Sequence, residues 1–196
     1  DLLFLVQHRF GTLNSGAYNF FGLDNAQVRI GLDYGLNDWL SLGIGRSSYL
    51  KTIDGNFKFR LLSQREGSKK KLFTLVCYSA IFLKQFPPEE NTINVFSDQL
   101  SYVYQILAAY KINSTLSLQL TPSYVHKNIV PPNYDHDLFA LGFGGRKKIT
   151  KRISINSEYF YQLNEYSDIN SISIGCDIET GGHVFQLHLT NSPAMF

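Results

Sequence analysis

Hydrophobic and polar residues alternate with a period of two along almost the whole chain. In the stretch GHVFQLHLTNS near the C-terminus, Phe185, Leu187 and Leu189 lie on one side of an extended backbone. Gln186 and His188 lie on the other side. Apolar residues spaced by three and four positions, which mark an amphipathic helix, are hard to find. The pattern therefore predicts an all-β chain.

Eleven segments carry this alternation and are predicted to be strands. The connections after the even-numbered segments are short turns such as GLND and KINST, whereas those after the odd-numbered segments are longer loops. An up-and-down meander that crosses a membrane has this arrangement, with short turns at one edge and long loops at the other. The predicted strands are 2–10, 25–35, 38–47, 54–65, 70–83, 97–111, 114–127, 135–148, 151–162, 169–179 and 182–191.

Charge divides between these two edges in the same way. Basic residues gather at the short-turn edge and acidic residues at the loop edge, so the two edges are expected to face different surroundings. The bases are Arg65, Lys69, Lys70, Lys71, Lys111, Lys147, Lys148, Lys151 and Arg152, and the acids are Asp24, Asp54, Glu89, Glu90, Asp135, Asp137, Glu165 and Asp168.

The two faces of the predicted strands differ in kind. One face is apolar in nearly every strand, with sets such as Val28, Ile30 and Leu32, whereas the opposite face is mostly Ser, Gly, Gln and Asn. A soluble barrel would carry Lys and Glu on its outer face, but small and amide side chains suit a crowded interior in which polar groups satisfy one another. We therefore place the polar face, with Gln186 and His188, in the lumen and the apolar face against lipid, in preference to a soluble lipocalin-like barrel.

Composition favours a membrane barrel over other classes. Charged residues make up only 17% of the 196 residues, the mean hydropathy is -0.11, and no run approaches the roughly 18 apolar residues of a membrane helix. The net charge of +2 is too small to indicate binding of nucleic acid. Cys77 and Cys176 sit among apolar residues and are interpreted as small hydrophobic side chains. No cofactor is expected.

The strand count sets a further expectation. Single-chain bacterial barrels of the outer membrane have an even number of strands, so eleven strands is one short. We predict a single domain over 1–196, a transmembrane antiparallel up-and-down β-barrel of about twelve strands, with eleven present and the final one lacking.

Several short motifs resemble those of a known family. They are HRFG (8–11), GLDYG (31–35), GIGRS (43–47), LGFGGRKKITKR (141–152) and DIETGGHVFQLHLTNS (177–192), of which the last is specific. Over essentially its whole length the chain resembles an uncharacterised family of predicted outer-membrane β-barrels from Gram-negative bacteria, a domain of unknown function. The resemblance implies the fold and a location in the outer membrane, together with one further strand. It implies no activity.

Nine polar residues are predicted to line the lumen. The bases lie on the second and fourth strands and the acids mainly on the ninth and tenth. They form either an internal plug of salt bridges and hydrogen bonds or a narrow, charge-lined conduit for a small polar solute or ion. We favour the plug because Gln and Ser fill most of the remaining interior. The nine residues are Arg29, Asp33, Lys58, Arg60, Glu158, Asp177, Glu179, Gln186 and His188.

Two patterns that could carry chemistry are interpreted as structural. The segment HLTN (188–191) is similar to the His-x-Ser-Asn pattern of outer-membrane phospholipase A and lipid A deacylase, but Thr190 replaces the nucleophilic serine and faces the lumen. The segment DHD (135–137) could hold a metal ion. Alternation along the strand, however, places the histidine on the face opposite to the two aspartates, which favours a solvated loop edge. No catalytic and no metal site is predicted.

The expected function is therefore that of a non-enzymatic accessory or scaffold subunit in a larger assembly of the outer membrane of a Gram-negative bacterium. Its expected partners are outer-membrane lipid and other outer-membrane proteins. Tyr18, Phe20 and Phe21 in the loop 11–25 are predicted to contact such a protein, or else they form the small core of that loop. A narrow channel and, less favoured, a lipid-acting hydrolase are the alternatives.

Overall fold

The computed structural model contains all eleven predicted strands in one antiparallel sheet, ordered as in the chain. It describes residues 1–9, 16–22, 24, 27–65, 67, 71–85, 96–130, 132, 134–164, 169–181 and 183–191. The strands are β1 (Leu2–Arg9), β2 (Gln27–Gly35), β3 (Leu40–Ser47), β4 (Ile53–Leu62), β5 (Thr74–Leu83), β6 (Leu100–Lys111), β7 (Leu116–Lys127), β8 (Asp137–Lys148), β9 (Ile153–Gln162), β10 (Ser171–Glu179) and β11 (Val184–Thr190).

The ends of the strands differ from the predicted ends by up to four residues. The strand predicted over 97–111 begins at Leu100, because Phe96–Gln99 forms a short 3₁₀ helix, η4. Two further 3₁₀ segments, η2 (Ala17–Gly22) and η3 (Tyr49–Lys51), lie in connections at the loop edge. Among the described residues, none of the helices is long and apolar enough to cross a membrane.

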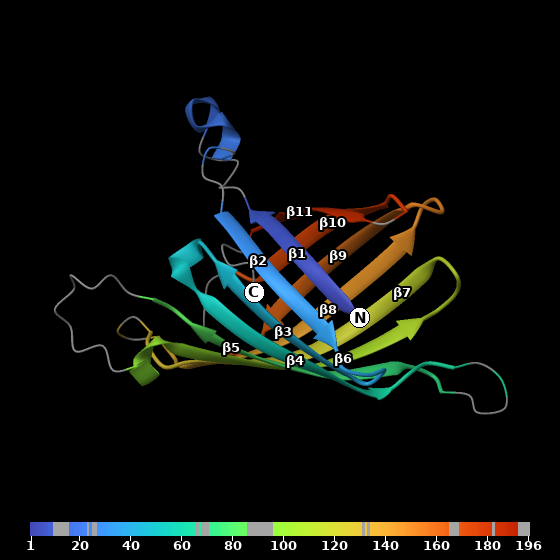
Figure 1. The fold of residues 1–196 in the computed structure, drawn as a ribbon, viewed down its shortest axis with the longest axis horizontal. Coiled ribbons are helices and arrows are strands. Elements are labelled where there is room, and N and C mark those ends of the chain that lie inside the picture. Colours follow the sequence, from blue (N-terminus) through green and yellow to red (C-terminus); the bar gives the residue numbers. More distant parts are fainter. Residues whose placement is uncertain are drawn as a thin grey trace.

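The sheet curls into a barrel, with the N-terminal strands in front of the C-terminal strands in Figure 1. β1 and β11 lie at the two ends of the sheet, and they run in the same direction because the strands alternate and both have odd numbers. Within the described residues these two strands are not paired with each other. Residues 192–196 lie outside the described part, so the twelfth strand stays a prediction.

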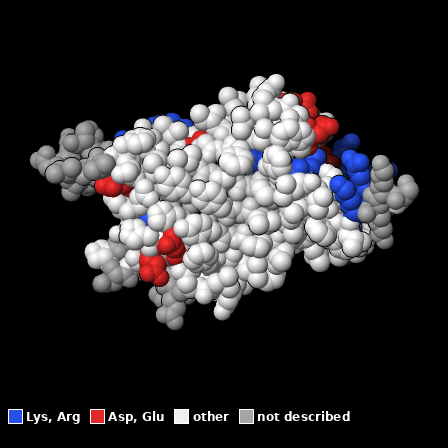
Figure 2. All heavy atoms as spheres, turned by 90° about the horizontal axis from the view of Figure 1, so that it is seen from below, with Lys and Arg blue, Asp and Glu red and all other residues white. Residues whose placement is uncertain are grey.

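The polar face of the sheet is on the inside, as predicted. Large apolar side chains such as Ile44, Phe143 and Leu187 are exposed on the outer face. On the face drawn in Figure 2, uncharged residues form a broad continuous band and charged residues gather toward its ends. Such an apolar surface requires lipid rather than water around it. The buried side chains are mostly polar: Arg29, Ser47, Thr52, Asp54, Ser101, Thr121, Ser123, Ser154 and Asp177, against Ala80, Phe82 and Ala140.

Side-chain oxygens close three of the short turns. The Asn37 Oδ1 accepts hydrogen bonds from the backbone N–H groups of Trp39 and Leu40, at 3.0 and 2.9 Å. Asn113 does the same in the turn between β6 and β7, and the Thr150 hydroxyl oxygen does so between β8 and β9. These side-chain oxygens accept hydrogen bonds that a backbone carbonyl would otherwise have to accept. The chain can therefore turn with few residues at this edge.

Candidate functional site

A buried ion pair joins β2 to β4 inside the lumen. The guanidinium group of Arg29 donates from Nε to Asp54 Oδ1 at 2.9 Å and from Nη2 to Asp54 Oδ2. Its third nitrogen, Nη1, donates to Gln7 Oε1 on β1 at 3.0 Å. We call Arg29, Asp54 and Gln7 the Arg29 cluster. The bidentate pair, the strongest arrangement available to these side chains, links β2 to β4, and the bond to Gln7 adds β1.

Two glycines make room for this guanidinium group. Gly31 and Gly45 lie opposite each other on β2 and β3, and Gly45 is also opposite Asp54 on β4. A Cβ atom at Gly31 would come within 2.9 Å of Arg29 Nη1, and one at Gly45 would lie 2.6 Å from its Cζ. The flat cation therefore lies against bare backbone, as expected of strand glycines.

A second, more open pair lies further along the same strands. Lys58 Nζ donates to Asp33 Oδ2 at 3.3 Å, and the Lys58 side chain is about half exposed. Gly43 separates Asp33 from Asn56 and has no space for a side chain between them. This pair borders the Arg29 cluster but is more accessible to water.

The C-terminal half of the barrel has its own polar cluster around Asp177. Arg146 on β8 donates from Nε to Asp177 Oδ2 at 3.1 Å and from Nη2 to Glu179 Oε1 at 3.3 Å. Asn156 and Gln186 both donate to Asp177 Oδ1, at 2.9 and 3.1 Å. These five residues, the Asp177 cluster, tie β8, β9, β10 and β11 together across their inner faces.

The remaining predicted lumen residues stand outside these two clusters. Arg60, Glu158 and His188 follow the inward parity of their strands but are exposed. No hydrogen bond from any of their side chains is present within the described part of the chain. The ring of His188 lies close to Gly175, where a Cβ atom would come within 2.9 Å of it.

Two central residues of the lumen are absent from the nine predicted from the sequence. Asp54 lies at the loop end of β4, as predicted, but its side chain points into the barrel and is 3% exposed. Arg146 is the other. The period-two alternation does place both residues on the inner face. Arg146 follows the inward-facing Gly142 and Gly144 at even spacing, and Asp54 precedes the inward-facing Asn56 by two positions.

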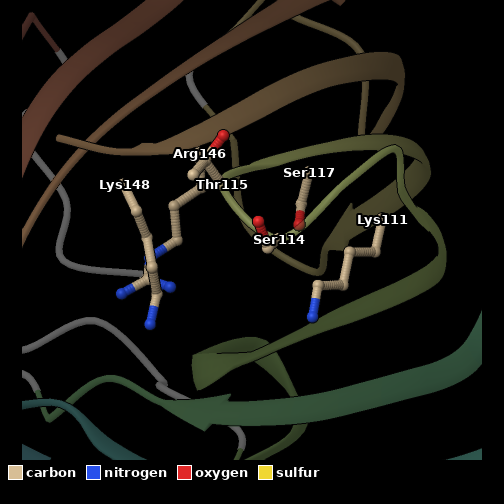
Figure 3. A pocket seen from close by; sticks show the side chains of 6 residues that line it. All are labelled: Lys111, Ser114, Thr115, Ser117, Arg146 and Lys148. Carbon is tan, nitrogen blue, oxygen red and sulfur yellow. The ribbon is translucent and has the colours of Figure 1, made fainter. Parts of the chain in front are cut away.

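Two cavities open at the short-turn edge. The first, of about 300 Å³, is lined by Lys111, Ser114, Thr115, Ser117, Arg146 and Lys148. Figure 3 shows the ends of Arg146 and Lys148 together on one side, Lys111 on the other, and serine hydroxyls between them. The second cavity, of about 270 Å³, shares Lys111 with the first and adds Arg65 and Lys71. Both cavities are therefore cationic.

A family model described as "Membrane bound beta barrel domain (DUF5777)" matches residues 1–196. The chain belongs to this family. No curated protein and no solved structure matches it significantly. Membership agrees with the apolar outer face and polar lumen, and it establishes a membrane-bound barrel domain of unknown function.

In this membrane-bound barrel domain, η2 carries the predicted partner contact. Tyr18 is 96% exposed and Phe20 is 61% exposed. Figure 1 shows η2 standing off from the end of the barrel between β1 and β2. Tyr18 and Phe20 therefore do not form a packed core for their loop. The side chain of Phe21 lies outside the described residues.

At least one residue in each of the two segments HLTN and DHD makes structural hydrogen bonds. Asn191 accepts from the Ile172 N–H at 2.8 Å and donates to the Asn170 carbonyl at 2.9 Å, which fixes the end of β10. Asp137 Oδ1 lies 2.6 Å from both the Tyr124 hydroxyl and His126 Nδ1. In the described residues, no three His, Cys, Asp or Glu side chains are placed to hold a metal ion.

Proposed function

We propose that this barrel is a non-enzymatic accessory subunit of an outer-membrane assembly in a Gram-negative bacterium, with a lumen closed by paired polar side chains. The exposed aromatic residues of η2 are the observation that carries the proposal. A membrane protein that works alone gains nothing from holding Tyr18 and Phe20 in water, whereas a partner protein would cover them on binding.

The backbone of η2 supports the same conclusion. Phe20 has a φ of 44°, in the left-handed region that residues other than glycine rarely adopt. Such conformations cost free energy and gather at sites of recognition. This conformation lies within the short projecting turn that carries both Tyr18 and Phe20.

The proposed closure of the lumen rests on its charge pairing. The Arg29 cluster crosses the inner face of β1, β2 and β4, and the Asp177 cluster crosses that of β8 to β11. A conducting pore needs unpaired polar groups that replace the hydration shell of a passing solute. Here the most buried charges already bind each other, which favours the plug over the narrow channel.

The test compares η2 with a matched site at the same edge. In membranes extracted with mild detergent, a native gel and mass spectrometry should find the wild-type chain in a larger complex. The double variant Tyr18→Ser, Phe20→Ser should run alone. Leu50→Ser is the control, because Leu50 is also exposed, has a positive φ and lies in η3. It should leave the complex intact.

Two outcomes contradict this proposal. A wild-type chain that runs alone in native membranes would remove the accessory role. Steady single-channel currents from the purified barrel in a planar bilayer would show an open lumen and would support the narrow channel in its place.

A further inference from the structure

We propose that the cavity between β6, β7 and β8 at the short-turn edge is a binding site for a phosphate group. The site consists of the six residues that line it, and we call it the β6–β8 mouth: Lys111, Ser114, Thr115, Ser117, Arg146 and Lys148. The accessory role proposed above does not depend on this site, and this site does not depend on the accessory role.

The strand register places the charged residues of the mouth on one inner surface. Lys111 lies opposite Ser117, and Ser117 lies opposite Arg146. Directly opposed residues of antiparallel strands point to the same face of the sheet. Lys148 follows Arg146 by two positions and shares that face, whereas Lys147 between them points outward, opposite Leu116 and Ile155. Three cations thus converge on the lumen side of the wall.

The charge of the mouth is only partly neutralised by the protein. Arg146 is held by Asp177 and Glu179 through Nε and Nη2, which leaves Nη1 available. In the part of the chain that the structure describes, no carboxylate lies within ion-pair distance of Lys111 or Lys148. Two ammonium groups that face each other across a cavity repel, and a bound anion would relieve that repulsion.

Hydroxyl donors complete the site. The hydroxyls of Ser114 and Ser117 have no hydrogen-bond partner among the described residues, whereas that of Thr115 donates to Asn113 Oδ1 at 2.9 Å. A phosphate group offers several strong acceptor oxygens, and ammonium, guanidinium and hydroxyl groups are the donors that suit it. The mouth therefore has both the charge and the hydrogen-bond donors for a phosphate group.

The backbone beneath these side chains is held firmly. Gln64 clamps the end of β6, because its Oε1 accepts from the Lys111 N–H at 2.7 Å and its Nε2 donates to the Lys111 carbonyl at 2.9 Å. On the other side, the Lys148 N–H donates to the Thr115 carbonyl at 2.8 Å. Both lysines therefore project from fixed points, which lowers the entropy cost of binding.

The size of the cavity limits the ligand. A volume of about 300 Å³ is at the lower limit of pockets for small organic ligands, so the mouth accommodates a phosphate with a small group attached. That phosphate could belong to a soluble monoester that enters the lumen or to an anionic lipid headgroup at the rim. Arg65 and Lys71 in the adjoining cavity extend the positive potential that attracts either.

The soluble arm of the test uses glycerol 3-phosphate, with glycerol as the uncharged comparison. The full chain is refolded in dodecyl maltoside, which carries no phosphate, and binding is followed by titration calorimetry. We expect Lys148→Gln to weaken binding about tenfold, as for one lost charged contact, and Lys111→Gln to act similarly. Lys147→Gln is the matched control, with the same charge change at the next residue, and should alter the affinity less than about twofold.

The lipid arm uses native mass spectrometry of the barrel from nanodiscs of phosphatidylcholine with or without phosphatidic acid. Retention of phosphatidic acid that Lys148→Gln abolishes and Lys147→Gln preserves would assign the phosphate to a lipid. Binding of glycerol 3-phosphate with the same dependence would assign it to a soluble ester. Absence of both, or equal loss in the two variants, would overturn the proposal. Circular dichroism verifies that each variant is folded.

Discussion

The guanidinium group of Arg29 occupies the space where a side chain at Gly45 would lie. Gly45 is on the neighbouring strand β3, and a Cβ atom there would lie 2.6 Å from Cζ and 2.8 Å from Nε of Arg29. Asp54, opposite Gly45 on β4, holds the guanidinium group in that space. The pair shows how this lumen is filled: long side chains of one strand cross the glycines of the next.

The substitution Gly45→Ala should therefore destabilise the barrel. Arg29 is fixed by two bonds to Asp54, so the new methyl group must displace a buried ion pair, at a cost of about 1–3 kcal/mol as for other overpacked interiors. Gly144→Ala is the control, because the nearest atom to its Cβ would be 3.6 Å away. Urea unfolding, followed by the fluorescence of the single tryptophan, Trp39, measures both. Equal effects would mean that Gly45 is not a special position.

Removal of Asp54 should cost far more than removal of Asp33. Asp54→Ala leaves Arg29 buried without its carboxylate, which typically costs about 3–5 kcal/mol. Asp33→Ala breaks a 3.3 Å pair with the half-exposed Lys58 and should cost at most about 1 kcal/mol. The same urea titration compares them. A loss from Asp33→Ala as large as that from Asp54→Ala would contradict the assignment of the buried pair.

An arginine should destabilise the barrel on the lipid-facing side of β7 but not on its lumen-facing side. Leu120 points outward and is 40% exposed, whereas Gln119 faces the lumen. In vesicles, Leu120→Arg should lower the free energy of unfolding by about 2–4 kcal/mol, since it places a charge in lipid. Gln119→Arg should change it much less. The reverse order would place the apolar face on the inside.

Lys84, which follows β5 at the loop edge, should make stability depend on pH. Burial lowers the pKa of Lys84, and nearby Lys127 lowers the pKa further. Between the lowered pKa and the ordinary value, the unfolded chain binds more protons, so stability should rise with pH. Lys84→Met removes the burial of a charge and should stabilise the barrel at neutral pH. Its advantage should shrink as the pH rises from the lowered pKa of Lys84 toward the ordinary value of 10.5, and it should not change further above that value. A constant advantage would mean that the charge is not responsible.

The strands could be predicted because the alternation recurs in most of them; β1 and β5 instead carry apolar runs on both faces. A half-buried strand needs only a period of two, so the pattern alone located all eleven strands and assigned Ile44 and Leu187 to the outside. The ends of the strands were less accurate. Side-chain bonds such as those of Asn37 decide where a turn begins, and periodicity does not report them.

The alternation and the charge pattern were enough to predict the architecture: strands, two faces, two edges of opposite charge, and a polar inside that requires lipid outside. Which charges meet became visible in the folded barrel. Arg29 binds Asp54, 25 residues away, and Arg146 binds Asp177, 31 residues away. Parity assigns a residue to a face, but the stagger between strands decides which residues on that face come within hydrogen-bond distance, and the stagger depends on the whole sheet. For the same reason, Lys111, Arg146 and Lys148 appeared in the sequence as scattered bases and become a single cavity only in the folded barrel.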